Sequence, residues 1–293
     1  MATTQRGLNG RVAAITGGAR GIGRATAEAF VRRGMLVAIG DLDLPEAERA
    51  ADAIGGGTIA LPLNVTDRAS VDAFVDATEQ RLGPLEVLVN NAGIMQLGSF
   101  ATEDDATTQR QIDINVNGVL HGMKSVLPRF LARRTGHVVN VASSAGKGGF
   151  PGGATYCGTK HFVVGVSEAV RAEVRDQGVL VSCVMPGVVD TELATGLNQA
   201  RGIRVVQPTD VAEAIVEALE TGRFDVFVPK SIGPLSQVMG LLPRGGRDRI
   251  TKALKADQVL ALADPVARRD YELRAARSEP GLTAGDDQRQ LTP

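Results

Sequence analysis

Short runs of apolar residues recur along the chain, and longer segments with apolar positions at helical spacing separate them. The short runs are rich in Val and Ile and end at Gly, Pro, Asn or Asp, which is typical of buried strands. They cover residues 12–15, 35–39, 58–61, 85–89, 137–141, 179–184 and 224–228. The helical patterns between them cover residues 24–33, 45–54, 68–81, 103–131, 155–176 and 209–220.

This alternation of strand and helix patterns predicts an α/β fold. Strands that are apolar along their whole length are expected in a parallel sheet covered on both faces. We therefore predict a doubly wound parallel sheet of about seven strands with helices on both faces, formed by residues 1–229.

The pattern changes after Pro229. An apolar helical face runs from Ile232 to Leu242 and stops at Pro243, and a second helix is expected from Arg247 to about Ala263. We expect residues 230–263 to be a helical extension of the same domain. Residues 264–293 end in a segment rich in Pro, Gly and charged residues, so they are expected to form a disordered tail.

Composition restricts the possible classes of protein. The 293 residues, 43% of them hydrophobic, suffice for one large core, and a net charge of −1 without a long basic block argues against nucleic acid as a partner. Cys157 and Cys183 are the only cysteines, and we expect no disulfide. The first ten residues lack an apolar leader segment, and no apolar run approaches about 18 residues. A cytoplasmic protein is expected.

A glycine-rich turn follows the first predicted strand. Residues 12–15 run into Thr-Gly-Gly-Ala-Arg-Gly-Ile-Gly, which ends at Gly23 and is followed by a helical pattern. Such a turn lets backbone N–H groups approach a pyrophosphate at the N-terminus of a helix. The Gly-x-x-x-Gly-x-Gly spacing differs from the GxGxxG of most dinucleotide-binding folds.

Three residues in the middle of the chain indicate proton-transfer chemistry. Tyr156 and Lys160 are four residues apart on a predicted helix and therefore share a face, and Ser143 follows a predicted strand. Lowering a phenol pKa from ~10 to about 7 requires roughly 4 kcal/mol, and a nearby ammonium group favours the phenolate. Ser144 is an alternative to Ser143. Neither serine has a His or Asp at triad spacing, so a hydrolase is poorly supported.

Taken together, these motifs resemble the short-chain dehydrogenase/reductase family over roughly residues 8–228. The resemblance implies a Rossmann-like fold, a nicotinamide cofactor, and hydride transfer between an alcohol and a carbonyl group. It rests on the glycine turn, Asn90-Asn91-Ala92-Gly93, Asn115, Ser143, Tyr156-x-x-x-Lys160 and Pro186-Gly187.

The resemblance also implies the catalytic roles. Tyr156 would act as general acid and base, Ser143 would polarise the substrate oxygen, and Lys160 would also hold the ribose hydroxyls of the nicotinamide half. Asn115 would sit at a backbone irregularity that holds a water in a proton relay from Lys160. Asn117 and an ordinary exposed helical Asn remain alternatives.

The cofactor is expected to be NAD, with NADP less favoured. Asp41 follows the second strand, where a carboxylate accepts ribose hydroxyls and repels a 2′-phosphate, whereas Arg20 lies where NADP-dependent relatives carry a basic residue. Asn64-Val65 would lie beside the adenine. The expected cofactor-binding residues are Gly17, Arg20, Gly21, Ile22, Gly23, Asp41, Asn64, Val65, Asn91, Ala92, Gly93, Tyr156, Lys160, Pro186, Gly187, Val189 and Thr191. The three histidines are scattered, and no metal site is expected.

The expected substrate is a small lipophilic secondary alcohol or ketone, because residues 94–100, 146–153 and 193–206 are apolar and contain few cations. An NADP-dependent carbonyl reductase is the alternative within enzymes, and a non-catalytic nucleotide-binding regulatory protein is the alternative of another class. The resemblance implies a homodimer or homotetramer that uses the helices at 103–131 and 155–176. The extension would cover the substrate cleft or pack on a neighbouring subunit, and contact with a membrane surface is less favoured.

Overall fold

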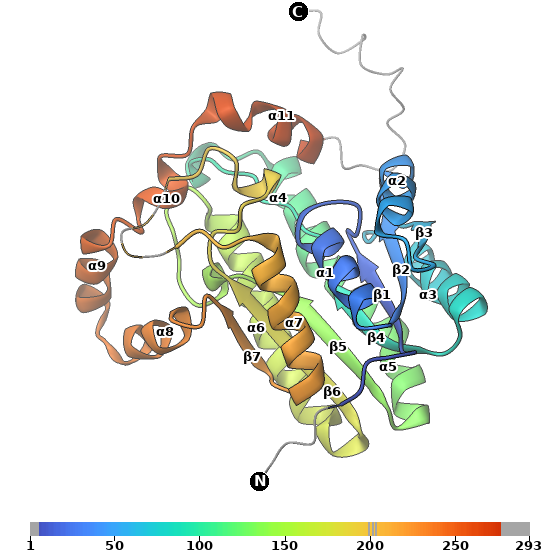
Figure 1. Cartoon of the computed structure of the whole chain (residues 1–293). Helices are drawn as coiled ribbons and strands as arrows, with labels where there is room; N and C mark the ends of the chain where they lie inside the picture. Colours follow the sequence, from blue (N-terminus) through green and yellow to red (C-terminus); the bar gives the residue numbers. More distant parts are fainter. Residues whose placement is uncertain (1–5, 199, 201, 203, 277–293) are drawn as a thin grey trace, which may run out of the picture.

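A seven-stranded parallel sheet runs through the centre of the protein (Figure 1). The computed structural model describes residues 6–198, 200, 202 and 204–276. The strand order is β3-β2-β1-β4-β5-β6-β7. The strands are β1 (Val12–Thr16), β2 (Leu36–Asp41), β3 (Ile59–Pro62), β4 (Leu85–Asn90), β5 (Gly136–Val141), β6 (Val179–Pro186) and β7 (Asp225–Val228).

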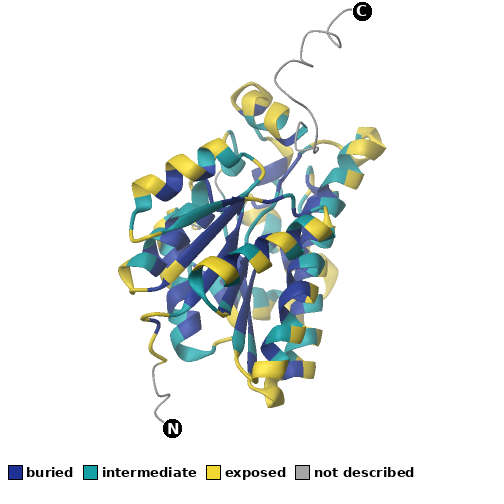
Figure 2. Cartoon of the chain, turned by 90° about the vertical axis from the view of Figure 1, so that its right-hand side faces the viewer, coloured by how far each residue is buried: buried dark blue, intermediate teal, exposed yellow. Residues whose placement is uncertain are grey.

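Helices cover both faces of this sheet, so the predicted doubly wound α/β fold is confirmed. One core contains the buried sides of α1 (Gly21–Arg32), α2 (Leu44–Ile54) and α7 (Pro208–Thr221). The opposite core contains those of α3 (Arg68–Leu82), α5 (Gly118–Arg133) and α6 (Ala154–Val174). Figure 2 shows the buried sheet between half-exposed helices. Strands buried on both faces explain the uninterrupted apolar runs in the sequence.

The strand order reverses between β1 and β4, because chain connections leave this point in opposite directions. In doubly wound sheets a ligand binds outside the carboxyl ends of the strands at such a point. The turn from β1 into α1 and the loop after β4 therefore lie where a cofactor is expected.

The long helix expected over residues 103–131 is interrupted. The structure has α4 (Asp105–Ile112), then five residues of π-helix (Asp113–Asn117), then α5. A π turn inserts one extra residue and changes the direction of nearby side chains, and such turns occur often at functional sites. The irregularity that the family resemblance implied at Asn115 is thus present in the backbone.

The end of the chain is more ordered than the sequence suggested. After α8 (Ile232–Leu241) the structure has α9 (Arg244–Ala253) and α10 (Gln258–Ala261) where one helix was expected, because Lys255 adopts a positive φ of 53° between them. The disordered tail predicted from residue 264 is wrong for its first part, since Pro265–Ala276 forms helix α11. The rest of that prediction lies outside the described residues.

The sequence at the start of α11 contains a helix-start signal, although the overall composition of the tail suggested disorder. The Asp264 side chain accepts hydrogen bonds from the N–H groups of Val266 and Ala267, at 2.8 and 3.2 Å, and Pro265 occupies the first helical position. Asp followed by Pro is a common helix start. None of the helices among the described residues is long and apolar enough to cross a membrane.

Candidate active site

A cavity of about 920 Å³ opens at the carboxyl ends of the strands. It brings together every residue predicted for the cofactor or for catalysis except Gly23 and Asn115, which lie behind its wall. The C-terminal extension contributes to the same cavity through residues of α8, α9, α10 and α11. One continuous space therefore contains the predicted nucleotide site, the predicted catalytic residues and the apolar segments predicted for the substrate.

Tyr156 and Lys160 lie on α6 and face this cavity together with Ser143, which follows β5. The Lys160 Nζ is 5.8 Å from the centre of the Tyr156 ring and donates a 3.1 Å hydrogen bond to the Val141 carbonyl oxygen. The Ser143 side chain lies close enough to the Tyr156 hydroxyl to lower its pKa. The predicted trio is thus assembled around one phenol.

Burial shifts the pKa values of Tyr156 and Lys160 in opposite directions. It raises the pKa of Tyr156 to about 12, although the Ser143 side chain lowers it, and it lowers the pKa of Lys160 to about 8. In both cases the neutral form is favoured, because burial disfavours charge. A positive charge bound next to Tyr156 would lower its pKa, which is what an oxidised nicotinamide ring supplies.

Ser144, the alternative to Ser143, also lines the cavity but begins a short 3₁₀ turn, Ser144–Gly146. Ser143 is better fixed, because its Oγ accepts a 3.1 Å hydrogen bond from the Ala145 N–H. Ser143, and not Ser144, also acts on the pKa of Tyr156, which favours the prediction of Ser143.

Asn115 is fully buried in the π-helical segment, directly behind the catalytic residues. Its Oδ1 accepts from the Ile94 N–H at 2.9 Å, and its Nδ2 donates to the Ile94 carbonyl at 2.9 Å and to Thr159 at 3.1 Å. A Cβ on Gly93 would lie 3.1 Å from Asn115 Oδ1 and 3.5 Å from Lys160 Nζ. Asn117, the alternative, bonds Asp113 instead.

The glycine turn is packed too closely for side chains. Gly17 has a φ of +64°, and a Cβ there would lie 2.9 Å from the Ala92 Cα, while a Cβ on Gly23 would lie 2.2 Å from the Gly17 carbonyl oxygen. Asn91 fixes the turn by donating from Nδ2 to the carbonyls of Thr16 and Gly17, at 3.0 and 2.9 Å. The cavity floor is therefore bare backbone at the N-terminus of α1, and these residues fit a dinucleotide.

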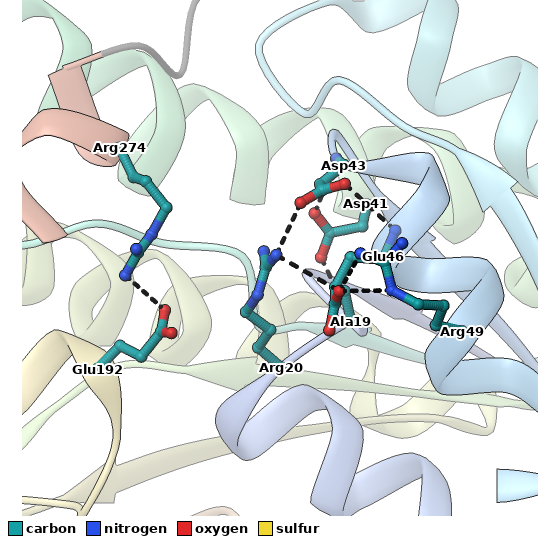
Figure 3. A network of polar contacts seen from close by, with 8 residues as sticks. All are labelled: Ala19, Arg20, Asp41, Asp43, Glu46, Arg49, Glu192 and Arg274. Carbon is teal, nitrogen blue, oxygen red and sulfur yellow. Dashed lines mark hydrogen bonds and ion pairs between the residues drawn. The ribbon is translucent and has the colours of Figure 1, made fainter. Parts of the chain in front are cut away.

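A polar network surrounds the end of β2 (Figure 3). The Asp41 carboxylate accepts from the N–H groups of Ala19 and Asp43, each at 3.1 Å. Burial raises the pKa of Asp41, and these two bonds lower it. Arg20 donates to the Asp43 carboxylate at 2.7 Å and lies 3.8 Å from Glu46. Arg20 thus has acidic partners on α2, which sequence spacing did not reveal.

The remaining predicted cofactor residues line the cavity in two groups, Asn64-Val65 and the segment from Pro186 to Thr191. The Asn64 Oδ1 accepts from the N–H and the hydroxyl of Thr66, at 3.1 and 2.8 Å. An amide oxygen has two lone pairs. Both lone pairs of the Asn64 amide oxygen are therefore occupied, and its NH₂ group is what remains for the nucleotide.

The part of the cavity beside Tyr156 is apolar. A cluster of buried side chains contains Met95, Ala145, Tyr156, Val259 and Leu260, and partly buried Leu97, Phe150, Leu193 and Leu197 pack against it. The segments predicted to hold the substrate thus meet at Tyr156, together with residues of the extension.

Two residues of α11 were missed by the sequence reasoning. Tyr271 lines the cavity, and Arg268 is buried behind it with 2% of its surface exposed. Arg268 donates to the carbonyls of Met95, Leu193 and Thr195 at 2.8, 2.9 and 3.0 Å. The rarity of tyrosine, with two in the chain, was the available signal for Tyr271.

Fold and site define a nucleotide-dependent oxidoreductase, and comparisons with known proteins agree. A family model described as short chain dehydrogenase matches residues 11–202. The chain belongs to this family of NAD(P)-dependent enzymes, which act on alcohol and carbonyl groups.

Individual relatives are similar over most of the chain. Sorbitol dehydrogenase of Cereibacter sphaeroides is 40% identical over 192 residues, 65% of this chain and 75% of that protein. Glycine betaine reductase ATRR of Emericella nidulans is 36% identical over 72% of this chain, but the match spans only 18% of that protein. The crystal structure of a short chain dehydrogenase/reductase from Burkholderia phymatum in complex with NAD has a TM-score of 0.74 and 27% identity, covering 80% of this chain and 94% of that one.

Proposed function

We propose that the protein transfers hydride between NAD and an apolar secondary alcohol or ketone, with Tyr156 as general acid and base. The observation that carries the proposal is the cavity that Ser143, the buried Tyr156 and Lys160 line together, with the Lys160 ammonium 5.8 Å from the phenol ring and an apolar cluster beside it. A non-catalytic nucleotide-binding role would leave this arrangement without a use.

The residues divide the chemistry between them. NAD supplies the hydride acceptor for oxidation. Ser143 holds the substrate oxygen, and the Tyr156 oxygen takes the hydroxyl proton, so that the carbinol carbon can release hydride. Lys160 stabilises the phenolate by its charge. In the reverse reaction Tyr156 returns the proton to the carbonyl oxygen. Asn115 supports this site by fixing the Ile94 backbone behind Lys160.

NAD is preferred to NADP in this proposal because of charge at the end of β2. The Asp41 carboxylate retains acceptor capacity for the two ribose hydroxyls and would repel a 2′-phosphate in a partly buried site. Arg20, the group that would favour NADP, is already bonded to Asp43 at 2.7 Å. The NAD complex of the Burkholderia phymatum relative supports the same choice.

The preferred cofactor is a measurable prediction. We expect kcat/KM to be at least ~10-fold higher with NAD than with NADP, a difference of about 1.4 kcal/mol. Asp41→Ala should narrow this ratio, because it removes the repulsion. Asp43→Ala serves as a comparison, since it removes the nearest acidic partner of Arg20 but keeps the Asp41 carboxylate, and it should improve use of NADP. Equal or better use of NADP by the unmodified protein would contradict the assignment.

The substrate class is supported by the apolar side chains packed around Tyr156, among them Met95, Leu193 and Leu260. The test is a panel of alcohols with NAD and of ketones with NADPH, scored by kcat/KM. Preference for lipophilic secondary alcohols with NAD supports the proposal. Preference for ketones with NADPH would favour the carbonyl reductase alternative, and absence of turnover with saturable NAD binding would favour a regulatory protein.

We also propose that the protein forms a homodimer or homotetramer in the cytoplasm. The family is commonly oligomeric, and α6 carries the exposed Phe162 with partly exposed Val166 and Val170. Both cysteines, Cys157 and Cys183, are free thiols, as cytoplasmic proteins usually have. Light scattering at micromolar concentration measures the assembly, and a monomeric mass would rule it out.

A further inference from the structure

The chain has two tyrosines and no tryptophan, and both tyrosines line the same cavity. Tyr156 comes from α6, and Tyr271 comes from α11, the helix that lies over the carboxyl ends of the strands (Figure 1). The mechanism proposed above uses the first phenol and assigns nothing to the second.

The Tyr271 hydroxyl accepts a hydrogen bond within the protein but donates none among the described residues. Its oxygen accepts a 2.8 Å hydrogen bond from the Met95 N–H. A phenol also donates one proton, and within the described part of the chain no acceptor is paired with that proton. Burial raises the pKa of Tyr271, although the hydrogen bond from the Met95 N–H lowers it, so the group remains a neutral donor at physiological pH.

The position of this donor is fixed from two sides. The Arg268 guanidinium carbon lies 4.9 Å from the centre of the Tyr271 ring, and the Met95 N–H holds the hydroxyl. Arg268 itself bonds the carbonyls of Met95 and Leu193, whose side chains belong to the apolar cluster around Tyr156. The ring is thus attached to the same two loops that form the substrate part of the cavity.

We propose, building on the function proposed above, that Tyr271 is a substrate-specificity residue that donates a hydrogen bond to a second oxygen of the substrate. Ser143 and Tyr156 bind the reacting oxygen of the substrate, so Tyr271 bonds a different atom. The substrate class is then a lipophilic secondary alcohol or ketone that carries a further hydroxyl, carbonyl or ether oxygen. A substrate whose only oxygen is the reacting one would leave this donor unpaired. Sites built to bond an oxygen discriminate against analogues that lack it.

Oxidation of matched alcohols with NAD tests the assignment. The probes are 2-octanol and the ethers in which one oxygen replaces a methylene at successive positions, beginning with 1-butoxy-2-propanol. We expect the best ether to exceed 2-octanol in kcat/KM by at least ~10-fold in the unmodified protein. Tyr271→Phe should reduce that ratio to within about twofold, because the ether oxygen then lacks its donor.

Val266→Ala is the matched control, because Val266 lies on the same helix with 81% of its surface exposed. It should leave the ether preference unchanged. If Tyr271→Phe lowers kcat/KM for 2-octanol and the ethers equally, Tyr271 has a structural role and the proposal is wrong. An ether preference that survives Tyr271→Phe, or no preference in the unmodified protein, also overturns it.

A binding measurement separates this proposal from the proposed function. In Tyr156→Phe, Tyr271 is the sole tyrosine of a chain without tryptophan, so intrinsic emission reports on Tyr271 alone. With NAD saturating, titration with the best ether should change this emission, and 2-octanol should not. If that variant still turns over, the role of Tyr156 fails while the emission result stands. If the ether and 2-octanol change the emission equally, the role proposed for Tyr271 is wrong even if Tyr156 is essential for turnover.

Discussion

Replacement of Tyr156 by phenylalanine is expected to lower kcat by at least ~100-fold in both directions, with NADH affinity changed by less than about twofold. Phenylalanine keeps the ring in the apolar cluster with Met95 and Leu260 but removes the proton that must move. General acid and base catalysis contributes about 10² to 10⁴ in rate. Steady-state kinetics and NADH fluorescence titration measure the two quantities separately.

The pH dependence follows from which form of the phenol each direction requires. Oxidation needs the phenolate, so its rate rises with pH toward the pKa of Tyr156, which burial raises to about 12 before any cofactor charge acts. Reduction needs the protonated phenol and should decline over the range where oxidation increases. Lys160, whose pKa burial lowers to about 8, loses its charge above that pH and stabilises the phenolate less.

Tyr271→Phe is the matched control for Tyr156→Phe, since it removes the other phenol of the same cavity. It should retain turnover of 2-octanol. Turnover close to the unmodified level in Tyr156→Phe would end the assignment of Tyr156 as acid and base, whatever its effect on binding.

Much of this site could be predicted from sequence because its parts are local. Tyr156 and Lys160 share a face through helix geometry, and Ser143 follows a strand whose end is fixed by the sheet. The glycine turn is likewise a run of adjacent residues. In each case the chain neighbourhood alone determines the geometry, which is why the predicted residues meet in one cavity.

The contribution of α11 could not be predicted because it depends on distant partners. The buried Arg268 bonds backbone carbonyls that are 73 to 173 residues away in the sequence. No local pattern distinguishes it from the exposed Arg269 beside it. The ion pair of Arg20 with Asp43 joins two different βα units in the same way. A segment with many charged residues is predicted to be exposed to solvent unless the partners of those charges are known.

Replacement of Arg268 by methionine is expected to detach α11 and to raise KM for the substrate by at least ~10-fold. Methionine fills similar space but donates no hydrogen bonds, so three backbone carbonyls and Glu272 lose their partner. Leaving a buried hydrogen-bonding group without its partner costs about 1–3 kcal/mol, and Arg268→Met leaves three such carbonyls. This exceeds what the hydrogen bond at Tyr271 or the half-exposed ion pair of Arg274 with Glu192 is expected to contribute, so hydrogen exchange of α11 should accelerate.

The side-chain bonds of Arg268 go to Met95, Leu193, Thr195 and Glu272 and not to the glycine turn or Asp41, so the expected loss is selective. NADH affinity should change by less than about threefold in Arg268→Met, because the glycine turn, Asp41 and Asn91 keep their own bonds. Arg269→Met, at the exposed neighbouring position, should leave KM and exchange unchanged. Arg268→Lys should be intermediate, since one ammonium cannot reach all the carbonyls that the planar guanidinium does. Equal effects of Arg268→Met and Arg269→Met on KM would mean that the buried guanidinium does not hold the substrate wall.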